Sequence, residues 1–274
     1  MSTVFVLVTD AGYFTKCKKT ICDLRSRGQW TGEIVVICIA GFTLPTTFKD
    51  FYELREIRFP EIEEKKILVQ KLHYTSFLDT IDGREINLIN QWEKLHVFDN
   101  YFLNWDRVVF FDAGLRVLDN VHDTILLLDY KDSFLAPDDG GNFVIPNPNK
   151  LFHTQISHTF KKILLDTVND FGGEQILQEN YFLNCIWVYD TSILSTCSKK
   201  DMIDGILKYP ICKTNEMALM NLFLHFRHRL WKPFPTHMNK KILFDWSELN
   251  NPGPSTWRDY CFIKYPWTIS FEDT

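Results

Sequence analysis

The sequence predicts an α/β fold in which a parallel sheet is covered by helices. Three runs carry this prediction because they are almost wholly apolar: residues 4–8 (VFVLV), 33–40 (EIVVICIA) and 107–111 (RVVFF). Such runs are typical of strands that are buried on both faces. The spacing of the first two leaves room for one helix between them, which is the βαβ arrangement of parallel sheets.

That helix is expected over residues 15–27. Cys17, Ile21 and Leu24 recur there at helical spacing, and Gly28 follows where a helix would end. Strand, helix and strand within about forty residues then make one βαβ unit, whose crossover is right-handed.

The later elements follow from the same patterns. Residues 55–59 predict a third strand, 60–84 contain one helix, and apolar residues at helical spacing over 87–103 predict a helix directly before the strand at 107–111. The remaining predicted elements are a helix around 154–168, a strand at 185–189 and a helix at 214–227. The tail from Pro233 onward is expected to be irregular. Since no repeat or low-complexity linker occurs, residues 1–274 are predicted to form a single domain.

Composition excludes several classes of protein. The net charge of −5 provides no overall positive field for nucleic acid or an anionic membrane. The apolar run 4–8 is too short for a membrane span or a signal peptide. Seven scattered cysteines without a CxxC pair favour neither a disulfide framework nor a zinc site, so a cytoplasmic location is expected. The frequent Phe, Ile, Asn and Lys are typical of an AT-rich genome, such as that of a parasite or a large virus.

Polar residues that directly follow buried strands are the first candidates for a site, because ligands of open α/β sheets bind beyond the carboxyl ends of the strands. The first strand is followed by Thr9, Asp10 and Tyr13, which could hydrogen-bond or stack on a base or could simply form a strand-to-helix turn with Asp10 or Thr15 as a cap. Asp112 follows the strand at 107–111, where it could ligate a divalent cation or form a turn.

Three further polar residues stand at element starts or in a turn. Asp138, in the run APDDG, is either a β-turn former or a carboxylate aimed at sugar hydroxyls. Asn184 precedes the strand CIWVY and Glu216 lies in NEMALMN, and for both of them helix capping is the alternative to a functional role. The paired histidines at 153/158 and 225/228 lack a metal-binding spacing.

Taken in order, these segments resemble the glycogenin-like retaining glycosyltransferases of family 8. The resemblance rests on the following segments: VFVLVTDAGYFTKC, WEKLH, RVVFFDAGLRVLDNV, APD, LN before CIWVY, and NEMALMN. The resemblance implies the GT-A fold, a Rossmann-like nucleotide-sugar-binding fold with a mixed, mostly parallel central sheet flanked by helices. It also implies a UDP-sugar donor whose base and ribose contact Val8, Thr9, Asp10 and Tyr13, with Lys94 on a phosphate or the ribose.

The resemblance further implies a Mn²⁺ or Mg²⁺ ion, held by two aspartates that flank one residue. Asp112 matches the first aspartate, but Gly114 stands in place of the second. His237 and Lys264 are the candidates for a metal-binding histidine and for a lysine on the leaving phosphate. Either the metal binds weakly through Asp112, or basic residues such as Lys94, Arg116 or Lys264 compensate the charge.

In the same resemblance Asp138, Asn184 and Glu216 contact the transferred sugar, with Glu216 in place of an aspartate and Met217 in place of a glutamine. The expected reaction is transfer of a hexose or N-acetylhexosamine to an acceptor glycan, protein or small molecule, with retention of configuration. Two alternatives stay open: a degenerate relative that only binds the nucleotide-sugar, and an inverting transferase in which Glu216 or Asp138 is a general base.

Overall fold

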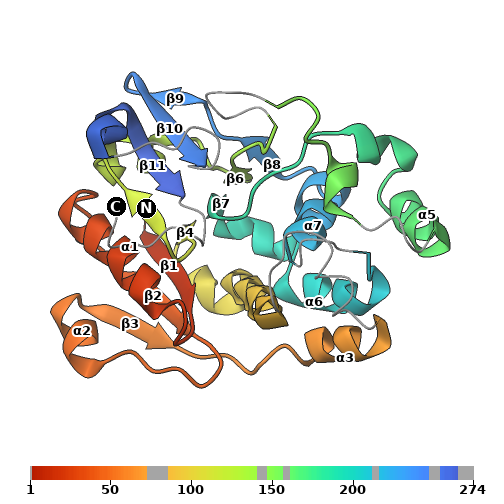
Figure 1. The fold of residues 1–274 in the computed structure, drawn as a ribbon, viewed down its shortest axis with the longest axis horizontal. Helices are drawn as coiled ribbons and strands as arrows, with labels where there is room; N and C mark the ends of the chain where they lie inside the picture. The colour runs from red at the N-terminus through yellow and green to blue at the C-terminus, as the bar shows by residue number, and fades with distance from the viewer. Residues whose placement is uncertain are drawn as a thin grey trace.

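A seven-stranded sheet forms the centre of the protein (Figure 1). The computed structural model describes residues 2–72, 86–140, 147–156, 161–211, 216–246 and 254–264. The strand order is β3-β2-β1-β4-β7-β6-β8. The strands span Thr3–Thr9 (β1), Ile34–Cys38 (β2), Leu54–Ile57 (β3), Arg107–Phe111 (β4), Phe134–Ala136 (β6), Ile186–Asp190 (β7) and Trp231–Pro233 (β8).

The sheet is mixed and mostly parallel, as predicted. Strands β3, β2, β1 and β4 pair in parallel, and so do β6 and β8. Strand β7 is antiparallel to both of its neighbours, β4 and β6. The carboxyl ends of β1, β4 and β6 therefore meet the amino end of β7 at one edge of the sheet.

Both faces of the sheet are buried, which explains the continuous apolar runs in its strands. Along β1, Val4 and Val6 pack into one core cluster, whereas Phe5 and Leu7 pack into a second cluster on the other face. Successive side chains of a strand point to opposite faces, so a run can be apolar throughout only where both faces are covered.

Helices cover the two faces. Helix α1 (Phe14–Ser26) and helix α2 (Thr46–Phe51) pack on the face that holds Phe5. The opposite face is covered by α3 (Glu63–Leu72), α5 (Lys161–Asp170), α6 (Lys199–Lys208), α7 (Glu216–Met220) and the 3₁₀ helices η1 (Ile86–Phe98) and η2 (Asn100–Asn104). In Figure 1, α1 and α2 lie on one side of the view and α5, α6 and α7 on the other. Among the described residues every helix is too short or too polar to cross a bilayer.

Short 3₁₀ helices fill most of the connections. They span Val121–Asp123, Ile125–Leu127, Phe152–Gln155, Glu174–Gln178, Thr191–Ser195 and Pro254–Asp259.

The described part of the carboxyl-terminal tail is not irregular, and this prediction was wrong. Its strands Tyr260–Lys264 (β11), Lys241–Trp246 (β10) and His237–Met238 (β9) join Leu115–Val117 (β5) in a second sheet of order β5-β11-β10-β9. All five residues of β11 are buried. The tail therefore contributes to the core on the α1 face, where Phe262 and Phe244 join the cluster.

Two predicted helices have other geometries. The helix before β4 is a 3₁₀ helix over Ile86–Phe98, and the predicted helix 214–227 is the short α7 followed by a π-helix, Asn221–Arg227. Residues 214 and 215 lie outside the described residues, as does most of 60–84 beyond α3. The predicted helix around 154–168 is observed as the 3₁₀ helix Phe152–Gln155 and helix α5, Lys161–Asp170.

Candidate functional site

The strand pairing brings Asp112 and Asn184 together at the edge of the sheet. Phe111 at the end of β4 pairs with Ile186 at the start of β7. The backbone N–H of Asp112 then donates to the carbonyl of Cys185 over 2.9 Å. Asp112 thus lies beside Cys185, the residue that follows Asn184, because β4 and β7 are antiparallel.

Lys94 connects Asp112 with Glu216. Its Nζ lies 3.2 Å from Oδ1 of Asp112 and 3.3 Å from Oε1 of Glu216. The amide Nδ2 of Asn184 donates to the same Oε1 over 2.8 Å. Lys94 comes from η1 and Glu216 begins α7, two elements on the same face of the sheet, and the network links both of them to the end of β4. These are four of the residues that the sequence predicts for the site.

Lys264, at the end of β11, forms a second ion pair with Asp112. Its Nζ donates to Oδ2 of Asp112 over 2.8 Å and to the carbonyl of Ala113 over 2.6 Å. Each carboxylate oxygen of Asp112 therefore faces one ammonium group. Lys94 and Lys264 are only 8% and 9% exposed and the Asp112 side chain is 22% exposed, so both ion pairs are largely shielded from bulk water, which strengthens their interaction.

A third lysine, Lys16, was missed by the sequence reasoning. It lies in the first turn of α1, and burial lowers its pKa, with repulsion from Lys264 lowering it further and Asp112 opposing the change. Both ions therefore act on Lys16. The signal that could have found it is its place directly after the loop that follows β1, where the predicted ligand contacts begin.

The two carboxylates differ in protonation. Burial tends to raise the pKa of Asp112, but Lys264 and Lys94 more than offset it, so the pKa lies below its usual range. Burial raises the pKa of Glu216, with Lys94 only partly opposing it. Burial lowers the pKa of Lys94, but Asp112 and Glu216 raise it above its usual range. The site therefore pairs a firmly anionic Asp112 with a Glu216 that takes up a proton more readily.

Glu216 also has one unused oxygen. The side chain is 1% exposed, and its Oε2 has no hydrogen-bond partner among the residues that the structure describes. A buried carboxylate oxygen without a partner is rare in native proteins, because it has lost its hydration without replacement. A ligand hydroxyl would satisfy it.

Asn221 fixes the position of this carboxylate. Its Oδ1 accepts the N–H of Phe182 and its Nδ2 donates to the carbonyl of Phe182, both over 3.0 Å. The same Nδ2 donates to the carbonyl of Met217. This two-way bond ties the start of the π-helix to the segment that carries Asn184, and so holds α7 beside β7.

Asp138 lies at the same edge but in a separate polar group. It forms an isolated antiparallel bridge with Phe182. Its Oδ2 accepts from Asn180 over 2.8 Å and its Oδ1 from the N–H of Gly140 over 2.9 Å. Asp138 thus takes part in a turn, the alternative that the sequence left open, and it also faces the segment before β7.

The neighbouring Asp139 is equally buried. It accepts from the hydroxyl of Tyr181 and pairs with Lys150 at 3.1 Å. Burial and the charge of Asp139 raise the pKa of Tyr181 above its usual range.

The loop after β1 is built around Asp10. Its Oδ1 accepts the N–H of Tyr13 over 2.9 Å, and its Oδ2 accepts from Asn90 over 3.1 Å. Thr9 is buried and its hydroxyl donates to the carbonyl of Asp10. Val8 packs in the core, whereas Tyr13 is 40% exposed, and Nζ of Lys16 lies over its ring at 5.8 Å from the centroid. Asp10 therefore closes the turn before α1, which was the alternative reading of this segment.

His237 is not brought to this cluster. It is exposed on β9 and pairs with Ile242, which in turn pairs with Tyr260. Lys264 stands four residues further along β11, a separation of about 13 Å at about 3.3 Å per strand residue. The role of a metal ligand beside Asp112 is therefore outside the reach of His237.

The residues around Asp112 do not fit a divalent cation. Both of its oxygens already face ammonium groups, and the position two residues on is Gly114 instead of a carboxylate. Among the described residues no group of three His, Cys, Asp or Glu side chains could hold a metal ion. Divalent cations of this class need several oxygen ligands, which this set of side chains does not supply.

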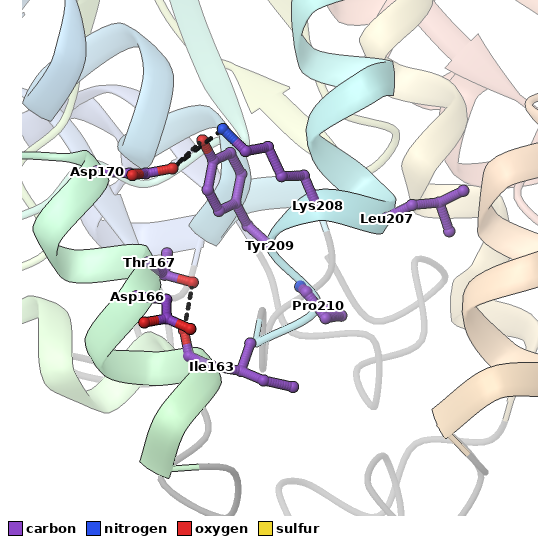
Figure 2. A pocket seen from close by; sticks show the side chains of 8 residues that line it. All are labelled: Ile163, Asp166, Thr167, Asp170, Leu207, Lys208, Tyr209 and Pro210. Atoms are coloured by element: carbon purple, nitrogen blue, oxygen red, sulfur yellow. Dashed lines mark hydrogen bonds and ion pairs between the residues drawn. The ribbon is translucent and has the colours of Figure 1, made fainter.

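A separate hollow lies elsewhere, between α5 and the end of α6 (Figure 2). Its volume is about 320 Å³, and it is lined by Ile163, Asp166, Thr167, Asp170, Leu207, Lys208, Tyr209 and Pro210. Asp170 accepts from Tyr209 and pairs with Lys208, so these polar groups are engaged with one another. None of the sequence-predicted site residues lines this hollow.

The fold matches solved glycosyltransferases. No family model and no curated protein matches the sequence. The galactosyltransferase LgtC, solved with donor and acceptor sugar analogues, superposes with a TM-score of 0.59 at 11% identity over 97% of this chain and 87% of its own. The bifunctional glycosyltransferase WbbM gives 0.58 at 13% identity over 98% of this chain and 46% of its own. The glycosyltransferase GlyE of Streptococcus pneumoniae TIGR4 gives 0.57 at 11% identity, over 100% and 56%. The chain thus spans about half the length of WbbM and GlyE, and it has the GT-A fold of these glycosyltransferases.

Proposed function

We propose that this protein transfers a hexose or N-acetylhexosamine from a UDP-sugar to a hydroxyl of an acceptor glycan, protein or small molecule, with retention of configuration. The observation that carries the proposal is the buried network in which Lys94 bridges Asp112 and Glu216. It lies at the carboxyl edge of a GT-A sheet, which is where ligands of such sheets bind. The match in fold to glycosyltransferases over nearly the whole chain supports the same class of reaction.

The residues divide into three groups. Val8, Thr9, Asp10 and Tyr13 contact the uracil and ribose, and the exposed ring of Tyr13 stacks on the base. The lysines around Asp112 bind the diphosphate. Glu216 through its unpaired Oε2, Asn184 and Asp138 bind the hydroxyls of the transferred sugar.

Retention requires the acceptor to attack from the face that the diphosphate leaves. The bond between the anomeric carbon and the phosphate oxygen breaks, and its electron pair stays on the phosphate. The acceptor oxygen forms the new bond, and its proton passes to the departing phosphate. Preorganised cations in a site with little water stabilise the charge that develops on this leaving group. Glu216 stabilises the positive charge that develops on the sugar.

The test compares UDP release by the wild type and by Glu216→Gln with UDP-glucose, UDP-galactose and UDP-N-acetylglucosamine. Glutamine keeps the oxygen that accepts from Asn184, removes the negative charge, and replaces the other oxygen by an NH2 donor. We expect one donor to be turned over by the wild type and its rate to fall by about 10² to 10³ in the variant. Asp166→Asn, an exposed change in the distant hollow, is the matched control and should leave the rate unchanged.

The outcomes separate the alternatives. Calorimetric binding of UDP without any UDP release from a donor would identify a protein that binds the nucleotide-sugar but does not transfer it. An inverted anomeric configuration of the product by NMR would identify an inverting transferase. If neither UDP nor any of the three donors binds, the proposal is wrong.

A further inference from the structure

The strongest unexplained feature of the site is that buried ammonium groups face both oxygens of Asp112, the carboxylate expected to hold a metal ion. Lys94 and Lys264 each face one oxygen of Asp112, and Lys16 is close enough for both Lys264 and Asp112 to act on it. Two buried ammonium groups thus hold Asp112, and Lys94 also pairs with Glu216. Buried charges are costly unless groups of opposite charge offset them.

We propose that Lys264 and Lys94, with Lys16 beside them, bind the diphosphate of the donor directly and in place of a divalent cation. The inference rests on the proposed function, because it concerns the same donor. Ammonium groups bind phosphates as point charges without fixed coordination geometry, so they can hold a diphosphate where the ligand set for Mn²⁺ or Mg²⁺ is incomplete.

The position of Lys264 supports this assignment. The side chain enters from β11, a strand of the second sheet, and its Nζ is held by Asp112 and by the carbonyl of Ala113. A strand that is buried along its whole length and paired on both sides positions this ammonium group firmly. The charge is therefore preorganised, as catalytic and binding cations need to be.

The backbone at Gly114 supports it further. Gly114 has φ of +95° and its N–H donates to the hydroxyl of Thr20 over 3.1 Å. A residue with a side chain is strained in this left-handed conformation. The turn between β4 and β5 is thus shaped for glycine, and it presents the carbonyl of Ala113 to Lys264 instead of a second carboxylate to a metal.

The test is calorimetric binding of UDP and of uridine to the full chain, each in EDTA and in Mn²⁺. We expect the Kd of UDP to agree within about threefold between EDTA and Mn²⁺, and UDP to bind at least about tenfold more tightly than uridine in EDTA. Lys264→Met should weaken the binding of UDP at least about tenfold and leave the Kd of uridine unchanged. Lys264→Arg keeps the positive charge and should bind UDP nearly as tightly as the wild type does. If the role of Lys264 were merely structural, Lys264→Met would weaken the binding of uridine as well.

The matched control is Lys241→Met on the adjacent strand β10, where Lys241 pairs with Asp119 at 2.8 Å. It should leave both ligands unchanged. If Lys264→Met fails to fold, Lys94→Met in EDTA makes the same comparison of UDP with uridine.

Two results would overturn the inference and leave the proposed function standing. One is UDP binding that is lost in EDTA and restored by Mn²⁺, which would show that a cation holds the diphosphate. The other is an equal loss of affinity for UDP and for uridine in Lys264→Met and in Lys94→Met. Failure of UDP to bind under every condition would instead contradict the proposed function itself.

Discussion

Single residues contribute to the site in two ways. Lys94, Asp112 and Glu216 form its charged network, whereas Asn221 holds the backbone of Phe182 by hydrogen bonds. The sequence indicated Asp112 because it follows a buried strand, Glu216 because it stands at a helix start, and Lys94 through the family resemblance. It could not indicate the pairing of Asn221 with Phe182, because the two residues are 39 positions apart and no local pattern connects them.

Asn221→Ala should destabilise the protein by about 2–4 kcal/mol, since the N–H and carbonyl of Phe182 would lose their partner in the interior. The measurement is urea unfolding of the wild type and the variant. Asn104→Ala is the control, because Asn104 donates to the carbonyl of Tyr101 on the surface. Its effect should stay within about 0.5 kcal/mol. Equal losses of unfolding free energy in the two variants would show that the hydrogen bonds between Asn221 and the backbone of Phe182 stabilise the protein no more than a surface hydrogen bond does.

At the scale of elements, the strands were predictable and the helical geometry was not. Strands β1 and β4 are covered on both faces, so their apolar runs are unbroken and stand out in the sequence. The run before β4 has helical periodicity, but spacing by itself does not separate an α-helix from the observed 3₁₀ helix.

The short strands of the tail were missed because they lack such runs. Strand β9 has two residues and is partly exposed, and β10 mixes lysine and aspartate with apolar residues. The one clear signal was β11, whose apolar residues Tyr260–Ile263 are all buried. It was overlooked among the Trp, Tyr and Pro residues that surround it.

The turn between β4 and β5 gives a prediction at this scale. Gly114→Ala should destabilise the protein by about 1–3 kcal/mol, because a Cβ is unfavourable at φ of +95°. Gly12→Ala is the control, since a Cβ there would meet only Oδ1 of Asp10 at 3.4 Å, an ordinary contact. Thermal unfolding of both variants makes the comparison. A Gly114 variant as stable as the Gly12 variant would contradict the strained geometry of this turn and its role in presenting Ala113.

At the scale of the whole molecule, the site is assembled from segments that are distant in the sequence. Lys264 and Asp112 are 152 residues apart. Sequence reasoning could name Asp112, Asn184 and Glu216 one by one because each stands at the end or start of an element, and it could name Lys94 through the resemblance carried by WEKLH. It could not show that the tail folds back beside β5, since long-range strand pairing depends on packing that no local propensity encodes. That residues 1–274 form one domain stays a prediction.

Hydrogen exchange tests whether the tail belongs to the same folded unit as the central sheet. Strand β11 is paired on both sides, with β5 and β10, and every one of its residues is buried, whereas β9 lies at an edge and His237 is exposed. We expect the amides of β11 to exchange as slowly as those of β4, and about a hundredfold or more slowly than those of β9. Mass spectrometry of peptides covering 107–111, 235–240 and 260–264 makes the comparison. Fast exchange in β11 beside a protected β4 would mean that the tail opens independently, so Lys264 would reach Asp112 only part of the time and could not act as a preorganised cation.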